Sequence, residues 1–152
     1  MYKKILLAVE ESGSVDKAIK KVIYLHKKWG CEVVMFHSMK HSISVLASIM
    51  LVSPYSVCYN YNGYNLLANY YKSKNFLRKK EEIFEEANIP VELRLIGDEN
   101  PDEYIERMIE EEDFDLIVLG LKSVSSKHNP FKISTVVKKI IDNAPCDVFV
   151  IE

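Results

Sequence analysis

Short apolar runs alternate with longer amphipathic segments along the whole chain. The runs have the length of β-strands and lie at residues 5–9, 31–36, 91–96, 116–120 and 148–151. In the longer segments, apolar residues recur at the spacing of a helix. Strands that alternate with helices are joined by right-handed crossovers, and their sheet is mostly parallel. The pattern therefore predicts an α/β fold: a five-stranded, mostly parallel sheet with helices on both faces, in a single three-layer domain spanning residues 1–152.

Several residues mark where the predicted helices begin and end. Ser12 or Ser14 can cap a first helix, which Gly30 ends. A long helix is predicted over residues 66–87, and its many charges fit a solvated face. Asn100 is placed as the N-cap of a further helix, with a proline at the first helical position. These helices are long enough to connect parallel strands.

Two polar features have both a structural and a functional interpretation. His37 ends the second strand, where it can be a ligand or a structural residue with its hydrogen bonds made inside the protein. The acidic run at residues 110–113 ends a helix, and we expect it to be solvated rather than to bind a metal ion. No metal site is therefore predicted.

Residues 40–63 interrupt the alternation of strands and helices. The segment has an apolar stretch too short for a membrane helix, then a proline and a run rich in tyrosine and asparagine. Long irregular segments in compact domains are often lids or partner-binding loops, and a short helix over the sheet edge is the simpler alternative. The tyrosines can also stack on a nucleobase. We interpret residues 40–63 as a variable insertion.

The stretch with most candidate chemistry begins with the buried strand at residues 116–120. A polar loop follows, and then a helix that Ser134 or Thr135 can cap. A helix N-terminus at the carboxyl edge of a parallel sheet exposes unpaired N–H groups and the positive end of the helix dipole, where phosphates bind. From the strand to the middle of this helix there are lysines, beginning with Lys122, and no acidic residue. The local charge therefore favours an anion.

These residues resemble the C-terminal signature of the universal stress protein family. In ATP-binding members of that family, Gly-x-x-Gly after the fourth strand, then nine residues and Gly-Ser or Gly-Thr, form the phosphate and ribose site. Gly120 stands at the first glycine, and Ser123 replaces the second. Ser134 replaces the third, with the gap one residue longer, and Thr135 keeps the hydroxyl. The resemblance implies the family's fold with a degraded nucleotide motif.

The resemblance includes the loop after the first strand, which in the family reads like Ala-Val-Asp-Gly-Ser, with the Asp helping to hold the adenosine. Here Glu10 keeps a carboxylate, and Glu11 adds bulk and negative charge in place of glycine. Ligands bind where the strand order reverses, which we expect between the strands that end at Val9 and Gly120. The candidate cofactor-binding residues are Ala8, Val9, Glu10, Gly120, Lys122, Ser123, Ser134 and Thr135. Because two glycines are lost and a carboxylate is gained, we expect ATP, the possible cofactor, to bind weakly or not at all.

The composition argues against several partners and locations. A formal net charge of −2 gives no general attraction to nucleic acid or to an anionic membrane. The basic and apolar start of the chain is too short for a signal peptide or a membrane span. Cys31, Cys58 and Cys146 are widely spaced, with no Cys-x-x-Cys pair, which favours a reducing, cytoplasmic location over disulfides or a zinc site.

The chain has none of the common catalytic motifs. It lacks a Gly-x-Ser-x-Gly elbow, a Walker Gly-x4-Gly-Lys-Ser/Thr sequence, His-Glu-x-x-His, and Gly-x-Gly-x-x-Gly after the first strand. Ser125, Ser126 and His128 lie close in sequence, but neighbours on one loop do not make a catalytic triad. We therefore predict that the protein is not an enzyme.

The last apolar run, Val148 to Ile151, predicts an assembly. Consecutive apolar residues are a poor sequence for an exposed edge strand unless something pairs with it or covers it. Members of the universal stress protein family commonly dimerise through this strand. We therefore expect a homodimer with a two-fold contact across Val148 to Ile151.

Three functions are compatible with these residues. We predict a non-catalytic stress-response or regulatory module that binds nucleotide weakly or not at all and acts through its dimer or through residues 40–63. The alternative is a nucleotide-dependent switch that binds ATP or AMP. An electron-transfer or other adenine nucleotide α-hydrolase-like domain shares the fold class and is a third alternative.

Overall fold

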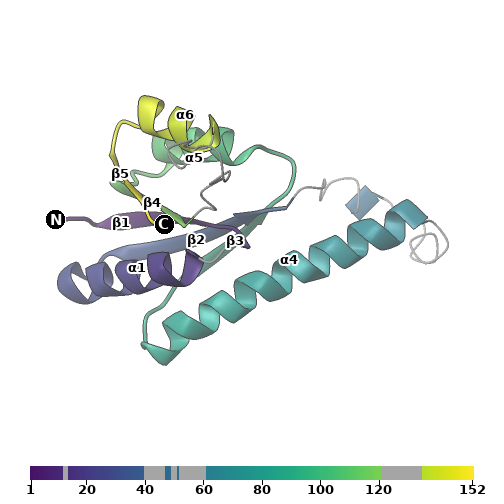
Figure 1. Cartoon of the computed structure of the whole chain (residues 1–152), viewed down its shortest axis with the longest axis horizontal. Helices are drawn as coiled ribbons and strands as arrows, with labels where there is room; N and C mark the ends of the chain where they lie inside the picture. Colours follow the sequence, from purple (N-terminus) through teal and green to yellow (C-terminus); the bar gives the residue numbers. More distant parts are fainter. Residues whose placement is uncertain (12–13, 40–46, 49–50, 52–60, 121–134) are drawn as a thin grey trace, which may run out of the picture.

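The computed structural model describes residues 1–11, 14–39, 47–48, 51, 61–120 and 135–152 (Figure 1). In chain order, its elements are β1 (Lys4–Val9), α1 (Val15–Trp29), β2 (Glu32–Ser38), α4 (Tyr61–Glu86), β3 (Glu92–Ile96), α5 (Pro101–Glu111), β4 (Leu116–Gly120), α6 (Thr135–Asn143) and β5 (Asp147–Val150). The predicted alternation of strands and helices is confirmed. Of the residues singled out in the sequence, Ser12, Cys58, Lys122, Ser123, Ser125, Ser126, His128 and Ser134 lie outside the described residues.

The strands form one parallel sheet in the order β3-β2-β1-β4-β5. β1 pairs with β2 on one side and with β4 on the other. The strand order therefore reverses between β1 and β4, as the sequence predicts. β3 and β5 form the two edges of the sheet, and the alternating polar sequence of β3 fits an edge position.

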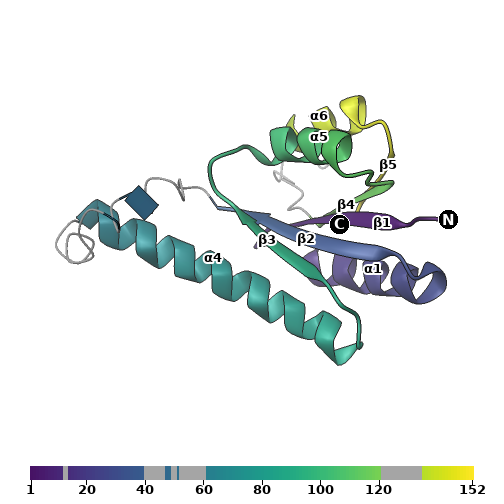
Figure 2. The same ribbon diagram turned by 180° about the vertical axis from the view of Figure 1, so that it is seen from behind.

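Helices cover both faces of the sheet and produce three layers (Figures 1 and 2). α1 and α4 lie on one face, and α5 and α6 lie on the other. Along β1 the side chains alternate between the faces: Ile5 and Leu7 belong to the first core, and Leu6 and Ala8 belong to the second. Burying each of the larger side chains contributes about 1.5–3 kcal/mol to folding. The predicted three-layer α/β fold is confirmed.

The predicted helix caps have the expected positions but not the expected side-chain bonds. Ser14 is the N-cap of α1 and Asn100 that of α5, yet neither side chain makes a capping hydrogen bond. Gly30 ends α1 in the left-handed conformation, with φ of 68°, and its N–H donates to the carbonyl of His26 at 2.7 Å. Glycine adopts this conformation without the strain that a side chain adds. Backbone geometry therefore defines these helix ends.

The long helix α4 begins earlier than the sequence predicts. It runs over Tyr61–Glu86, whereas apolar spacing predicts residues 66–87. The start of α4 projects beyond the sheet (Figures 1 and 2), and the first fully buried side chains among its described residues are Ser73 and Leu77. Helical turns outside the core need no apolar periodicity, so the pattern does not show them. Although α4 is long, neither it nor any other described helix is long and apolar enough to cross a membrane.

The acidic run at residues 110–113, which ends α5, is not purely solvated, because the side chain of Glu112 forms hydrogen bonds with the sheet. Its carboxylate accepts hydrogen bonds from Arg94 Nη1 and Nη2 at 2.7 and 3.0 Å, and from Lys4 Nζ at 2.8 Å. These bonds, first those of Arg94 and then that of Lys4, lower the pKa of Glu112 to about 2. The expectation of a solvated run is therefore wrong at Glu112. Among the described residues, no group of side chains is suited to hold a metal ion.

We predict that Glu112→Gln lowers stability at neutral pH and flattens the acid dependence of stability. Because the pKa falls from an ordinary 4.5 to about 2 in the folded protein, the ionised carboxylate contributes stability that is present above about pH 4.5 and lost as the pH falls toward 2. The free energy of unfolding of the variant, measured by urea titration, should change less over that range. Glu110→Gln removes an exposed carboxylate from the same helix and is the control. If the free energy of unfolding changed with pH in the same way for the wild type and for Glu112→Gln, the prediction would be contradicted.

α1 packs closely against the end of β4, and Gly120 makes this possible. A Cβ at position 120 would lie 2.9 Å from Ala18 Cβ and 3.5 Å from Val15 Cα. Carbon atoms in good contact are about 3.5–4.0 Å apart. The backbone of Gly120 is not left-handed, so space rather than conformation requires the glycine. The first glycine of the motif therefore has a packing role that is independent of any ligand.

Gly120→Ala is expected to destabilise the protein by about 1–3 kcal/mol, because it overpacks the contact with α1. Ala18→Gly relieves the overlap, although glycine inside a helix itself costs about 1 kcal/mol. The double variant should therefore be more stable than the sum of the single changes predicts, by about 0.5–3 kcal/mol. Denaturant unfolding of the four proteins measures this coupling. If the stability changes of the two single variants simply added in the double variant, contact with Ala18 would not be the reason that position 120 requires a glycine.

Candidate functional site

The carboxyl ends of β1 and β4 lie side by side, as the sequence predicts. Val9 pairs with Gly120 in the sheet register, so the two predicted site loops leave the sheet from neighbouring strands. Ala8, Val9 and Glu10 line a cavity at this edge. Gly120 is buried against α1 and does not line that cavity. Thr135 is the first residue of α6 and is exposed.

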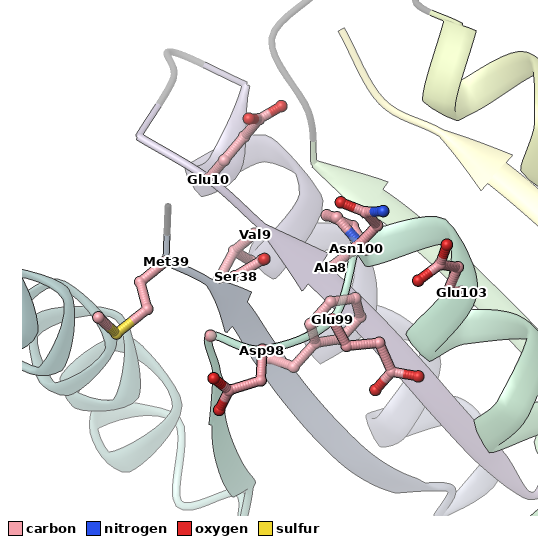
Figure 3. Close-up of a pocket in the computed structure, with 12 residues that line it drawn as sticks. Ala8, Val9, Glu10, Ser38, Met39, Asp98, Glu99, Asn100 and Glu103 are labelled. Atoms are coloured by element: carbon pink, nitrogen blue, oxygen red, sulfur yellow. The ribbon is translucent and has the colours of Figure 1, made fainter. Parts of the chain in front are cut away.

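The cavity has a volume of about 650 Å³ and lies between strand ends and the start of α5 (Figure 3). In addition to residues at the end of β1, two other segments line the cavity. The end of β2 contributes Phe36, Ser38 and Met39, and the turn after β3 together with α5 contributes Gly97, Asp98, Glu99, Asn100, Pro101 and Glu103. Sequence reasoning missed these contributions of β2 and of residues 97–103. The signal that could have found them is topological, because the carboxyl ends of parallel strands meet at one edge of the sheet.

The described lining of the cavity is acidic. It contains the carboxylates of Glu10, Asp98, Glu99 and Glu103 and no lysine, arginine or histidine. Figure 3 shows Glu10 on the opposite side from Asp98 and Glu99, so the carboxylates do not gather around one point. Arg107 donates two hydrogen bonds to Glu99, at 3.0 and 2.7 Å, which lower the pKa of that carboxyl. A negatively charged ligand in this cavity would be repelled by like charge.

The N-terminus of α5 borders the cavity, but carboxylates of the protein itself already lie near the positive end of this helix dipole. Pro101 has no N–H, and Asp102 and Glu103 lie in the first turn, near the positive end of the helix dipole. Asp102 is buried and accepts a hydrogen bond from Lys139 Nζ at 3.2 Å. This helix end is therefore poorly suited to a phosphate, and it is separate from the predicted phosphate site at the start of α6.

His37 joins the ends of β1 and β2. Its buried side chain donates a hydrogen bond from Nδ1–H to the carbonyl of Val9 at 2.8 Å. Because a carbonyl only accepts, the proton is on Nδ1. The ring packs against Phe76 of α4, with the ring centroids 4.9 Å apart. The structural interpretation of His37 is confirmed, and its bond positions the backbone of Val9, a candidate site residue.

The described cavity has binding groups but not an activated nucleophile. Ser38 has no histidine or lysine beside it in the described lining, and a serine nucleophile needs a neighbouring base. Phe36 and Met39 provide apolar surface, and the carboxylates accept hydrogen bonds from hydroxyl groups. Pockets with apolar walls and a few polar groups bind small organic ligands. This combination suits a neutral ligand that carries hydroxyl groups, such as a nucleoside, better than a polyanion.

The sequence matches the family model described as the Universal stress protein family over residues 1–152. A search of curated protein sequences gave no match. Among solved structures, the universal stress protein UspA from Lactobacillus plantarum is 18% identical, with 99% of this chain and 98% of that chain covered and a TM-score of 0.73. The universal stress protein from Archaeoglobus fulgidus in complex with dAMP is 17% identical, with 99% and 98% covered and a TM-score of 0.68.

Another solved structure, a universal stress protein in complex with cAMP, is 14% identical to this chain, with 98% and 95% covered and a TM-score of 0.59. At such low identities these structures establish a shared fold. The family match over the whole sequence agrees with the three layers, the parallel sheet and the motif residues around Gly120. The chain therefore belongs to the universal stress protein family.

Proposed function

We propose that this chain is a non-catalytic stress-response or regulatory protein whose adenine nucleotide site binds ATP weakly or not at all. The observation that carries this proposal is the acidic cavity beside β1. Its described lining holds four carboxylates and no cation, and one of the four, Glu99, is paired with Arg107 from outside the lining. Two unit charges 4 Å apart interact by about 4 kcal/mol at an effective dielectric constant of 20. Since about 1.4 kcal/mol changes affinity tenfold, a fraction of this repulsion is enough to weaken triphosphate binding severely.

The second candidate is a nucleotide-dependent switch, and the solved structures with dAMP and cAMP favour it. The cavity of about 650 Å³ is within the usual size range of small-molecule sites. A ligand with one phosphate meets less repulsion than ATP does. Lys122, Ser123, Ser134 and Thr135 are the proposed phosphate side of the site, and exposed lysines each offset only about 0.2–1 kcal/mol. We therefore expect any affinity to fall from adenosine to AMP to ATP.

Titration calorimetry with Mg-ATP, AMP and adenosine at low salt tests the proposal. We expect ATP to bind more weakly than adenosine, or without measurable heat. Asp98→Asn combined with Glu103→Gln removes two like charges and should raise the affinity for ATP at least about tenfold, with little change for adenosine. Glu110→Gln, which removes one carboxylate outside the cavity lining, should have no effect.

A sub-micromolar dissociation constant for ATP in the wild type would overturn the proposal in favour of the switch. Unchanged ATP affinity after the cavity charges are removed would show that the carboxylates do not decide binding. Ser123→Gly combined with Ser134→Gly restores the motif glycines. If this double change raises ATP affinity, the loss of close backbone approach to phosphate contributes to the weak binding.

We also propose a homodimer through β5, which is an edge strand of the sheet. Val150 is 40% exposed, and Ile141 of the preceding helix α6 is 46% exposed. Val148 and Phe149 are half-buried. An edge with unpaired backbone groups and exposed apolar side chains is suited to pair with another strand. A second copy related by a two-fold axis would bury the same surface on both chains.

Val150→Lys is expected to convert this dimer to a monomer, because the contact would bury a lysine from each chain without a partner. Light scattering coupled to size-exclusion chromatography measures the mass. Tyr71→Lys is the matched control, since Tyr71 is a 51% exposed side chain on α4, away from β5. The proposed interface is wrong if Val150→Lys stays folded and dimeric.

A further inference from the structure

The charged side chains are unevenly divided between the two helical layers. α1 carries five lysines and one carboxylate, whereas α5 carries five carboxylates and one arginine. These helices lie on opposite faces of the sheet (Figures 1 and 2). The net charge of −2 is thus a sum over a basic face and an acidic face. Our expectation of no general attraction to nucleic acid was based on that sum.

The lysines of α1 share an exposed face. The apolar residues of the helix pack in the core and are Val15, Ala18, Ile19, Val22 and Leu25. Tyr24 lies among the remaining positions and is 57% exposed. Helix positions three or four residues apart are neighbours. Lys20, Lys21, Lys27 and Lys28 therefore surround Tyr24, and Lys17 lies two turns before Tyr24 on the same side of the helix. These six exposed residues are called the α1 face.

Carboxylates do not neutralise the α1 face. Asp16, the acidic residue of α1, pairs with Lys80 of α4 at 2.7 Å. Lys17 donates to a main-chain oxygen of Glu152, the last residue of the sequence, at 3.2 Å, so the free positive charge is that of the other four lysines. In the part of the chain that the structure describes, Lys20, Lys21, Lys27 and Lys28 form no ion pair with a side chain. The face therefore presents uncompensated positive charge.

We infer that the α1 face binds single-stranded nucleic acid. Lysines that neutralise phosphates release condensed counterions, and this gain is available to exposed side chains. Tyr24 provides a ring on which a base can stack, and stacking tolerates any sequence because every base has a π face. Lys21 Nζ lies 5.5 Å from the centre of the Tyr24 ring. Base and phosphate contacts would thus come from adjacent side chains.

An anionic membrane fits the α1 face less well. Amphipathic helices bind membranes by inserting their apolar side chains among the lipids. The apolar side chains of α1 are buried in the core and are not available for insertion. The exposed face offers charge and one aromatic ring, a combination that matches phosphates joined to bases.

The acidic helix on the other face of the sheet does not cancel this attraction. At physiological ionic strength the Debye length is about 8 Å. α1 itself is about 10 Å across, and the sheet lies between it and α5. A strand of nucleic acid on the α1 face is therefore governed by the lysines around Tyr24 rather than by the net charge of the chain.

Fluorescence polarisation with a fluorescein-labelled single-stranded RNA of mixed sequence tests the inference. We expect the logarithm of the binding constant to fall with the logarithm of salt concentration with a slope of about −3, since each neutralised phosphate of a single strand contributes about 0.7. Lys20→Gln combined with Lys27→Gln should reduce the slope by about 1.4 and weaken binding at about 50 mM salt at least tenfold. Tyr24→Ala should weaken binding about fivefold or more with the slope unchanged, because stacking is not electrostatic.

Lys138→Gln, compared with Lys20→Gln alone, is the matched control, because it removes the same charge from an exposed position on α6, across the sheet. This control should leave the affinity for RNA and the slope of its salt dependence as in the wild type. All the substituted side chains are exposed, and circular dichroism checks that each variant is folded. Absence of binding at low salt, or equal losses for the α1 and α6 variants, would overturn the inference. Binding to vesicles that contain phosphatidylserine, without binding to RNA, would also overturn it.

Discussion

The structure depends on the position of β1, which is buried on both faces and paired along both edges. A strand of this kind needs an apolar layer on each side, and the chain must supply both. Because the crossovers are right-handed, connections that run one way along the sheet place their helices on one face, and connections that run the other way use the opposite face. Reversal of the strand order at β1 therefore produces the second layer, α5 and α6, together with the edge at which the candidate site lies.

The position of the site and its charge have different origins. The fold determines where the cavity lies, since the carboxyl ends of the parallel strands meet at one edge. The residues that follow each strand determine its chemistry, and here Glu10, Asp98, Glu99 and Glu103 make the described lining negative. We thus propose that this chain keeps the architecture of the universal stress protein family while the charge of the cavity disfavours a triphosphate.

The sequence predicted features that depend on local pattern. The runs that became β1 and β4 are apolar throughout because both of their faces are buried, and Gly30 marked a helix end because few other residues adopt its conformation. Features that depend on contacts between residues far apart in the sequence were missed. The bonds of Glu112 join it to Arg94, on another element, and no periodicity links the two. In the same way, the contribution of β2 to the cavity follows from strand order rather than from sequence spacing.

The close contact between Gly120 and Ala18 has a consequence for the diagnosis of nucleotide binding from sequence motifs. A chain that no longer binds nucleotide must still fit α1 against β4, so this glycine stays under selection for packing after selection for the ligand has ended. An intact first glycine in the motif therefore reports the retained fold, and by itself it says little about whether a ligand is still bound.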